Sequence, residues 1–321
     1  MMPITGSFFE FRHHSALEGK YYNPALRSFS REQWQTMLRD MKAAGMDTIV
    51  LMCSSIMYPD ECESYAPVDV FPKAQMACDN PLDVMMDTAE ELGLSVFLSA
   101  GFYGVWLNPL ENMQDPEVEK RAFTACRQMM DRYRGYQCFT GWYLPDETEA
   151  GPYFHPAFME YVRRYSEFFR GLDPEKKILV APYGTNKIRT DETFIDQLRH
   201  LDVDFVAYQD EVGVEKSAPE ETGKYYAALR RAHDAAGKSR LWADMEIFRF
   251  EGDVYRSALL PADMARIEKQ IQSLSPHVEK IIVYAYPGMM SRPGSIAGYG
   301  YDSPEKLYAD YMEWKKKLPK A

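Results

Sequence analysis

Two hydrophobic patterns alternate along the chain. Short runs rich in β-branched and aromatic residues, bounded by turn residues, are typical of buried strands, and the longer segments between them repeat their apolar residues at helical spacing. We count eight such pairs. The predicted strands cover residues 4–11, 48–54, 95–102, 139–144, 178–182, 205–209, 241–247 and 280–286. The predicted helices cover residues 31–44, 81–92, 116–133, 156–171, 191–200, 219–236, 261–274 and 304–317.

Residues at the ends of the predicted helices support these boundaries. Ser30 precedes the first helix and can cap it, and Asp115 stands before Pro116, which suits the first position of a helix. Glycines follow several of the helices, where the chain commonly turns into the left-handed conformation. These glycines are Gly45, Gly93, Gly171 and Gly237.

Eight strand–helix pairs without a linker predict the α/β class and a single (β/α)₈ TIM barrel, with residues 1–321 as one catalytic domain. A doubly wound open sheet is the alternative. It normally carries a glycine-rich turn after its first strand, whereas FFEFR at residues 8–12 contains no glycine. The longer predicted connections follow strands one, two, three and seven. Loops in these positions build the active face of a barrel.

Composition and charge exclude several classes of function. The net charge is −11 and no run of Lys and Arg stands out, which disfavours nucleic acid and anionic membrane surfaces as partners. No stretch reaches the roughly 18–20 apolar residues of a membrane span. The five cysteines lack CxxC spacing, which argues against a disulfide framework or a structural zinc site. We expect a cytoplasmic protein, with secretion as the alternative if a signal peptide has been removed. The oligomeric state stays open.

Acidic residues stand where four of the predicted strands end. They are Glu10, Asp146, Glu147, Asp210 and Glu246. A single acid after a strand is commonly a helix cap or a solvated charge, but the C-terminal ends of barrel strands all face one catalytic pocket. Glycoside hydrolysis needs two carboxyl groups beside the scissile bond, one protonated and one ionised. The sequence therefore predicts a glycosidase, a hydrolase of O-glycosyl bonds in an oligo- or polysaccharide.

Three motifs resemble a known family. GWYLPDE at residues 141–147, YQDEVGV at 208–214 and LWADMEIF at 241–248 look like those of a bacterial glycoside-hydrolase-like barrel family that is a domain of unknown function. That family in turn resembles the clan of retaining (β/α)₈ glycosidases. The resemblance implies that Glu147 is the general acid/base and Glu246 the nucleophile. Asp146 stands where the clan has Asn, which departs from its usual contact with the sugar 2-hydroxyl.

We also predict a set of substrate-binding residues. Polar side chains beside the catalytic pair would bind hydroxyl groups, and aromatic rings near the rim would stack on sugar faces. The set is Glu10, Trp106, Trp142, Asp146, Tyr208, Gln209, Asp210, Trp242 and Tyr286. We expect no cofactor and no metal. In the resembled clan the two acids lie close together, so we expect the short separation of a retaining enzyme.

Other functions fit the sequence less well than a glycosidase does. The tandem His13-His14 suggests a metal hydrolase, but strands five and six end without the His residues that such barrels use. No GxSxG turn is present, and no Lys stands at the inward ends of strands four to seven, where a sugar-phosphate isomerase or aldolase would place one. The Gly- and Ser-rich segment 287–300 is compatible with either a phosphate site or a loop that closes over sugar. A barrel that binds glycans without cleaving them stays the main alternative.

Overall fold

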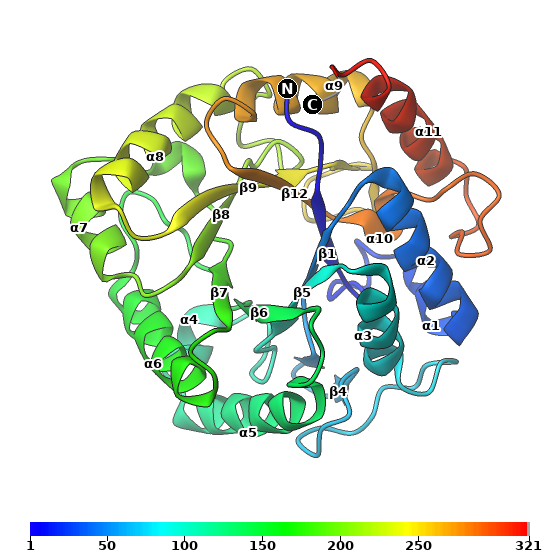
Figure 1. Cartoon of the computed structure of the whole chain (residues 1–321), viewed down its shortest axis with the longest axis horizontal. Helices are drawn as coiled ribbons and strands as arrows, with labels where there is room; N and C mark the ends of the chain where they lie inside the picture. Colours follow the sequence, from blue (N-terminus) through cyan, green and yellow to red (C-terminus); the bar gives the residue numbers. More distant parts are fainter. Residues whose placement is uncertain (320–321) are drawn as a thin grey trace.

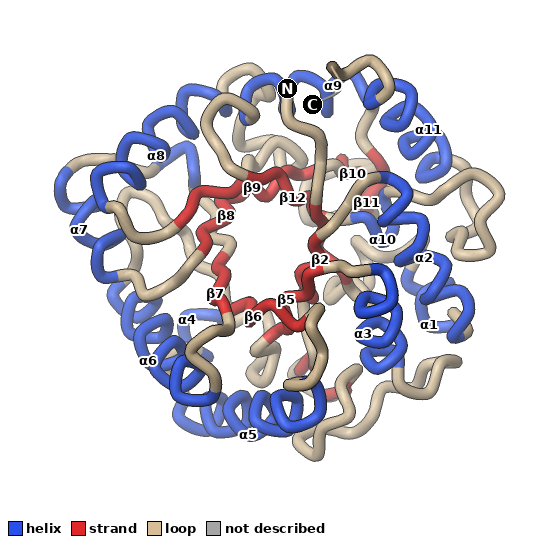
Figure 2. Tube along the Cα trace, in the orientation of Figure 1, coloured by secondary structure: helices blue, strands red, loops and turns tan. Residues whose placement is uncertain are grey.

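The computed structural model describes residues 1–319 and forms a closed barrel of eight parallel strands (Figure 2). β12 pairs with β1, with Gly6 opposite Ile282, and this pairing closes the barrel. The closed parallel barrel confirms the predicted fold class. The barrel strands are β1 (Gly6–Phe9), β2 (Thr48–Leu51), β5 (Ser95–Ser99), β6 (Phe139–Leu144), β7 (Lys177–Val180), β8 (Phe205–Gln209), β9 (Arg240–Glu246) and β12 (Lys280–Tyr284).

Eight helices surround the barrel, and each overlaps a predicted one (Figure 1). They are α2 (Arg31–Ala44), α3 (Pro81–Leu92), α5 (Pro116–Tyr133), α6 (Pro156–Leu172), α7 (Glu192–His200), α8 (Thr222–Ala236), α9 (Met264–Leu274) and α11 (Ser303–Lys315). Ser30 caps α2 by accepting a hydrogen bond from the backbone of Gln33. The expected helix end at Gly171 is wrong, because α6 continues to Leu172 and ends at the extended Asp173.

Several short elements lie in the connections that follow barrel strands, and the sequence patterns did not predict them. They are α1 (Asn23–Ser28), the hairpin of β3 (Ser55–Met57) and β4 (Cys62–Ser64), α4 (Pro109–Asn112), the 3₁₀ turn η1 (Thr185–Lys187), the hairpin of β10 (Phe248–Phe250) and β11 (Leu259–Pro261), and α10 (Tyr286–Met289). The second hairpin explains why α9 begins later than expected, since Pro261 belongs to β11. Within residues 1–319, no helix combines the length and the apolar character that crossing a membrane requires.

Strand periodicity decides which side chains enter the barrel. Successive side chains of a strand point to opposite faces, so Trp242, Asp244 and Glu246 of β9 share the inward face. Trp242 packs against Phe97 and Phe205, with ring centroids 6.0 and 4.2 Å away, and fills the interior toward the N-terminal ends of the strands. Asp244 and Glu246 follow toward the C-terminal ends, where they line a cavity.

Candidate active site

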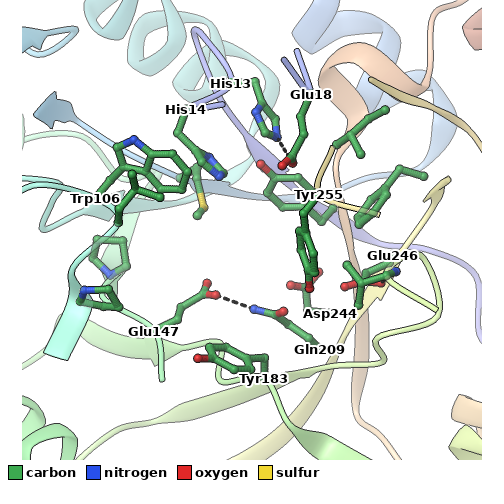
Figure 3. Close-up of a pocket in the computed structure, with 18 of the residues that line it drawn as sticks. His13, His14, Glu18, Trp106, Glu147, Tyr183, Gln209, Asp244, Glu246 and Tyr255 are labelled. Atoms are coloured by element: carbon green, nitrogen blue, oxygen red, sulfur yellow. Dashed lines mark hydrogen bonds and ion pairs between the residues drawn. The ribbon is translucent and has the colours of Figure 1, made fainter. Parts of the chain in front are cut away.

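A cavity of about 420 Å³ opens at the C-terminal end of the barrel (Figure 3). Four of the predicted site residues line it, namely Trp106, Glu147, Gln209 and Glu246. They come from β8, β9 and the connections after β5 and β6. The structure therefore brings both expected catalytic glutamates to the same cavity, as Figure 3 shows.

Glu147 follows β6 and is held through both of its carboxylate oxygens. Tyr143 donates a hydrogen bond from its hydroxyl to Oε1 at 2.5 Å, and Gln209 donates from Nε2 to Oε2 at 2.6 Å. Gln209 also donates to the carbonyl of Ala181, which fixes its orientation. Burial raises the pKa of Glu147 to about 7, against the lowering effect of these two hydrogen bonds. A carboxyl group in this state can carry a proton near neutral pH.

Glu246 ends β9, and its carboxylate lies against the backbone of the loop after β8. The N–H of Val214 donates to Oε2 at 2.9 Å. Gly213 is needed here for close approach, because a Cβ at this position would lie 2.9 Å from the same oxygen. Burial, followed by the charge of Asp210, raises the pKa of Glu246, while the backbone donors act in the opposite direction.

Asp210 does not line the cavity, and it contacts the backbone of Glu246. Its Oδ1 accepts a hydrogen bond from the backbone N–H of Glu246 at 3.0 Å, and its Oδ2 accepts one from Gln270 at 2.7 Å. Gln270 also donates to the carbonyl of Glu246. Asp210 is thus placed to position the end of β9, and direct contact with a sugar would require it to leave these partners.

Asp244 is a fourth buried acid, and the predicted site residues did not include it. It lines the cavity beside Glu246, and its Oδ1 has no hydrogen-bond partner among residues 1–319. Burial raises the pKa of Asp244 well above its usual value, and the charges of Glu147 and Glu246 raise it further. The raised pKa and the oxygen without a partner both favour the protonated form of Asp244.

Asp146 lies beside Glu147 but points away from the cavity. It is buried, and Asn112 donates to its Oδ1 at 3.3 Å. Burial raises the pKa of Asp146 to about 6. A hydrogen bond from this side chain to a sugar hydroxyl, the role of the Asn in the resembled clan, is therefore not prepared in this conformation.

Glu10, His13 and His14 form a cluster at the wall of the cavity. Tyr284 donates from its hydroxyl to Glu10 at 3.1 Å, and burial raises the pKa of Glu10 to about 8. One ligand atom from each of the three residues lies within 4.8 Å of the others. Imidazole nitrogens and carboxylate oxygens are common metal ligands, so these three residues could hold a metal ion. Burial lowers the pKa of His14 to about 4, so this ring is neutral and suited to contact a hydroxyl group.

Four of the aromatic predictions need correction, because these rings pack elsewhere. Trp142 stacks on Phe169 of α6, and Tyr208 contacts His233 of α8, so both face the helices. Trp242 fills the base of the barrel interior, as described above. Tyr286 is buried and its ring faces Tyr308 of α11. Trp106 is the predicted ring that lines the cavity, and it packs edge-on against His14 with centroids 4.5 Å apart.

Several lining residues come from loops that the sequence patterns did not connect with the site. Glu18, Tyr183, Lys216 and Tyr255 line the cavity together with Tyr284. Lys216 lies over the rings of Tyr183 and Tyr255 and pairs with buried Glu211 at 3.2 Å. Asp244 could have been found from the sequence, because it stands two residues before Glu246 on the same strand and therefore shares its face.

A family model, described as a domain of unknown function (DUF4434), matches residues 4–297. The chain belongs to this family. The match confirms the resemblance found in the three motifs. No curated protein matches the sequence.

Solved structures of glycoside hydrolases share the fold of this DUF4434 member. A candidate α-L-fucosidase from Bacteroides thetaiotaomicron superimposes with a TM-score of 0.77 at 16% identity, over 99% of this chain and 94% of that one. The endo-β-1,4-mannanase of Thermotoga petrophila gives 0.60 at 12% identity, over 100% and 78%. A β-galacturonidase from Eisenbergiella tayi gives 0.60 at 15% identity, and this chain spans 51% of its length. At these identities the likeness establishes a common fold.

Proposed function

We propose that this protein is a retaining glycoside hydrolase in which Glu147 is the general acid/base and Glu246 the nucleophile. One observation carries the proposal: glutamates from the ends of β6 and β9 line the same cavity at the C-terminal end of the barrel. The likeness in fold between this chain and solved glycosidases supports the proposal of the same class of chemistry. The substrate is then an oligo- or polysaccharide.

The expected reaction has two steps. Glu147 donates its proton to the glycosidic oxygen while Glu246 attacks the anomeric carbon, which breaks the glycosidic bond and forms a glycosyl ester. Glu147, now ionised, removes a proton from water, and the resulting hydroxide displaces Glu246 from the sugar. This route requires the two carboxyl groups to lie about 5–5.5 Å apart, whereas an inverting enzyme leaves roughly 6.5–9.5 Å. The shorter separation stays our prediction.

The reaction requires some of the buried acids to be protonated and others to be ionised. Asp210 accepts hydrogen bonds from Gln270 and the backbone, which favours its ionised form. Asp244 has an oxygen without a partner among the described residues and is the natural holder of a proton. When Asp244 is neutral, it does not repel the negative charge of the Glu246 carboxylate. Glu246 can then ionise while it accepts the hydrogen bond from the backbone N–H of Val214. The charge of an ionised Asp210 raises the pKa of Glu246 and opposes this ionisation, so a protonated Asp244 keeps a second negative charge away from the nucleophile.

A panel of aryl glycosides and polysaccharides tests the proposal. The wild type should cleave at least one of them, and Glu246→Gln should lower its kcat/KM by a factor on the order of 10⁴ or more. Glu167→Gln is the matched control, because Glu167 is an exposed acid of α6 that pairs with Arg163 on the same helix. Equal activity of Glu246→Gln and Glu167→Gln would refute the assignment of the nucleophile.

A glycan-binding barrel without turnover is the second candidate. It is favoured by the same burial that raises the pKa of Glu246, because a protonated glutamate cannot attack an anomeric carbon. Glycan binding by the wild type, with no product formed from any member of the panel, would establish this alternative.

A further inference from the structure

A second cavity of about 840 Å³ adjoins the first one. Its walls are the segment around α4, the loop between β6 and α6, and the first turns of α7. The two cavities share Leu107, Pro109, Glu147 and Tyr183. Glu246 and Asp244 line only the first cavity. Glu147 therefore stands at the junction, with Glu246 on one side of it and the second cavity on the other.

This arrangement distinguishes the side of the site that would hold the leaving group from the side that would hold the reacting sugar. In glycoside hydrolysis the general acid protonates the oxygen that departs with the leaving group, while the nucleophile faces the sugar whose anomeric carbon reacts. A cavity that is bounded by the acid and lies apart from the nucleophile is on the leaving-group side. We propose that the second cavity binds the leaving group, and that this leaving group is an uncharged sugar residue. The proposal rests on the proposed function, and it names the substrate class in more detail.

The lining of the second cavity fits an uncharged sugar. The lining contains no Lys or Arg, and it presents the carboxylate of Glu111, while the carboxylate of Glu149 is paired with Lys187. A phosphate, sulfate or uronate leaving group would therefore find no unpaired cation in the lining and would be repelled by Glu111. Hydroxyl and amide side chains suited to sugar hydroxyls occur beside aromatic and aliphatic ones. These polar residues are Asn108, Thr148, Thr193 and Gln197.

Two exposed leucines also stand at this cavity. Leu107 and Leu110 are 60% and 39% exposed, so both offer apolar surface at the cavity. The apolar face of a sugar ring is a suitable cover. Thr148 adds a buried hydroxyl without a hydrogen-bond partner among residues 1–319.

The walls of the second cavity are held in place without a ligand. Gln197 of α7 donates to the carbonyl of Phe154 and accepts from its N–H, both at 2.9 Å. Tyr153 donates from its hydroxyl to Asp191 at 2.7 Å. These contacts tie the loop after β6 to the N-terminal part of α7. A preformed cavity of this kind loses less free energy in ordering when it binds a ligand.

The experiment compares two substrates with the same reacting sugar, chosen from those that the wild type cleaves. One is a disaccharide with an uncharged second sugar, and the other is the glycosyl fluoride, whose leaving group needs no cavity. Thr193→Trp fills the second cavity from the exposed face of α7. We expect the ratio of kcat/KM for the disaccharide to that for the fluoride to fall at least about tenfold. Arg199→Trp, on the same helix outside the cavity lining, is the matched control and should leave the ratio unchanged.

Each outcome decides between the two proposals. If Thr193→Trp leaves the ratio unchanged, or changes it no more than Arg199→Trp does, the second cavity is not the leaving-group site, although the protein is still a glycosidase. A disaccharide with a uronate as its second sugar that is cleaved faster than the uncharged one would overturn the charge argument. If the wild type cleaves no glycoside from which such a pair can be chosen, the proposed function itself fails.

Discussion

The two ends of the barrel interior are built from the same strands but have different properties. Toward the N-terminal ends, Trp242 meets Phe97 and Phe205 in an aromatic layer. Toward the C-terminal ends, Asp244 and Glu246 meet Glu147 at a cavity. Trp242 and Glu246 are four residues apart on one face of β9, yet one packs and the other faces a cavity. The comparison shows that the position along the strand decides whether an inward side chain packs in the core or lines the cavity.

The largest effect on activity should come from substitutions at the C-terminal end of the barrel interior. We expect Glu147→Gln to lower kcat/KM on a natural glycoside by about 10²–10⁴-fold, because the leaving oxygen then departs without a proton. The loss should shrink for substrates with good leaving groups, which need no protonation. In the wild type, activity should fall as the pH rises through about 7, where Glu147 loses its proton. Steady-state kinetics between pH 5 and pH 9 measure both effects.

A pH limb near 7 that persists in Glu147→Gln would assign that limb to another group. Glu18, whose pKa burial also raises to about 7, is the first residue to examine in that case. A loss of equal size for good and poor leaving groups would mean that Glu147 does not act as the acid.

Substitutions at the N-terminal end of the barrel interior should lower the stability of the fold. We expect Trp242→Ala to lower the free energy of unfolding by about 3–5 kcal/mol, because it leaves a cavity in the aromatic layer. Trp106→Ala is the matched control, since Trp106 is only partly buried at the rim of the cavity, and it should cost clearly less. Denaturant unfolding measures both variants. Equal losses would show that the two ends do not differ in the way we describe.

The smallest effect concerns Glu10, which follows β1 and lies with His13 and His14 at the wall of the cavity. Burial raises its pKa to about 8, so the folded protein holds a proton that the unfolded chain releases near pH 4.5. The stabilisation linked to this proton is complete below pH 4.5 and is lost as the pH rises through about 8. Glu10→Gln, which stays neutral, should therefore raise Tm relative to the wild type more at pH 8 than at pH 5. A difference in Tm that does not change with pH would contradict the raised pKa.

The same comparison explains which predictions from the sequence succeeded. Hydrophobic runs and helix caps depend on local spacing, and all eight barrel strands followed from them. Acids at strand ends could be assigned to one face because the barrel brings those ends together. The predictions for Trp142 and Tyr208 were wrong because successive residues of a strand face opposite sides. Tyr143 and Gln209 point into the barrel, so Trp142 and Tyr208 must point away from it.

Other residues of the site could not be found from local patterns. Lys216 and Tyr255 come from separate loops, and only the packing of those loops brings them to the cavity. Trp242 points into the barrel, but it lies toward the N-terminal ends of the strands and not at the cavity. Its position along the barrel axis depends on the register of β9 with its neighbouring strands. Such relations are set by tertiary contacts between segments that are distant in the sequence.

Trapping the covalent intermediate tests the central claim most directly. An activated 2-deoxy-2-fluoro glycoside of the sugar that the enzyme cleaves should form a slowly hydrolysed ester with the nucleophile. Mass spectrometry of the digested protein should then find the sugar attached to Glu246 in the wild type, and no attachment in Glu246→Gln. A sugar attached to Asp244 instead, or turnover of the natural substrate without any trapped ester and with an inverted product, would contradict the account.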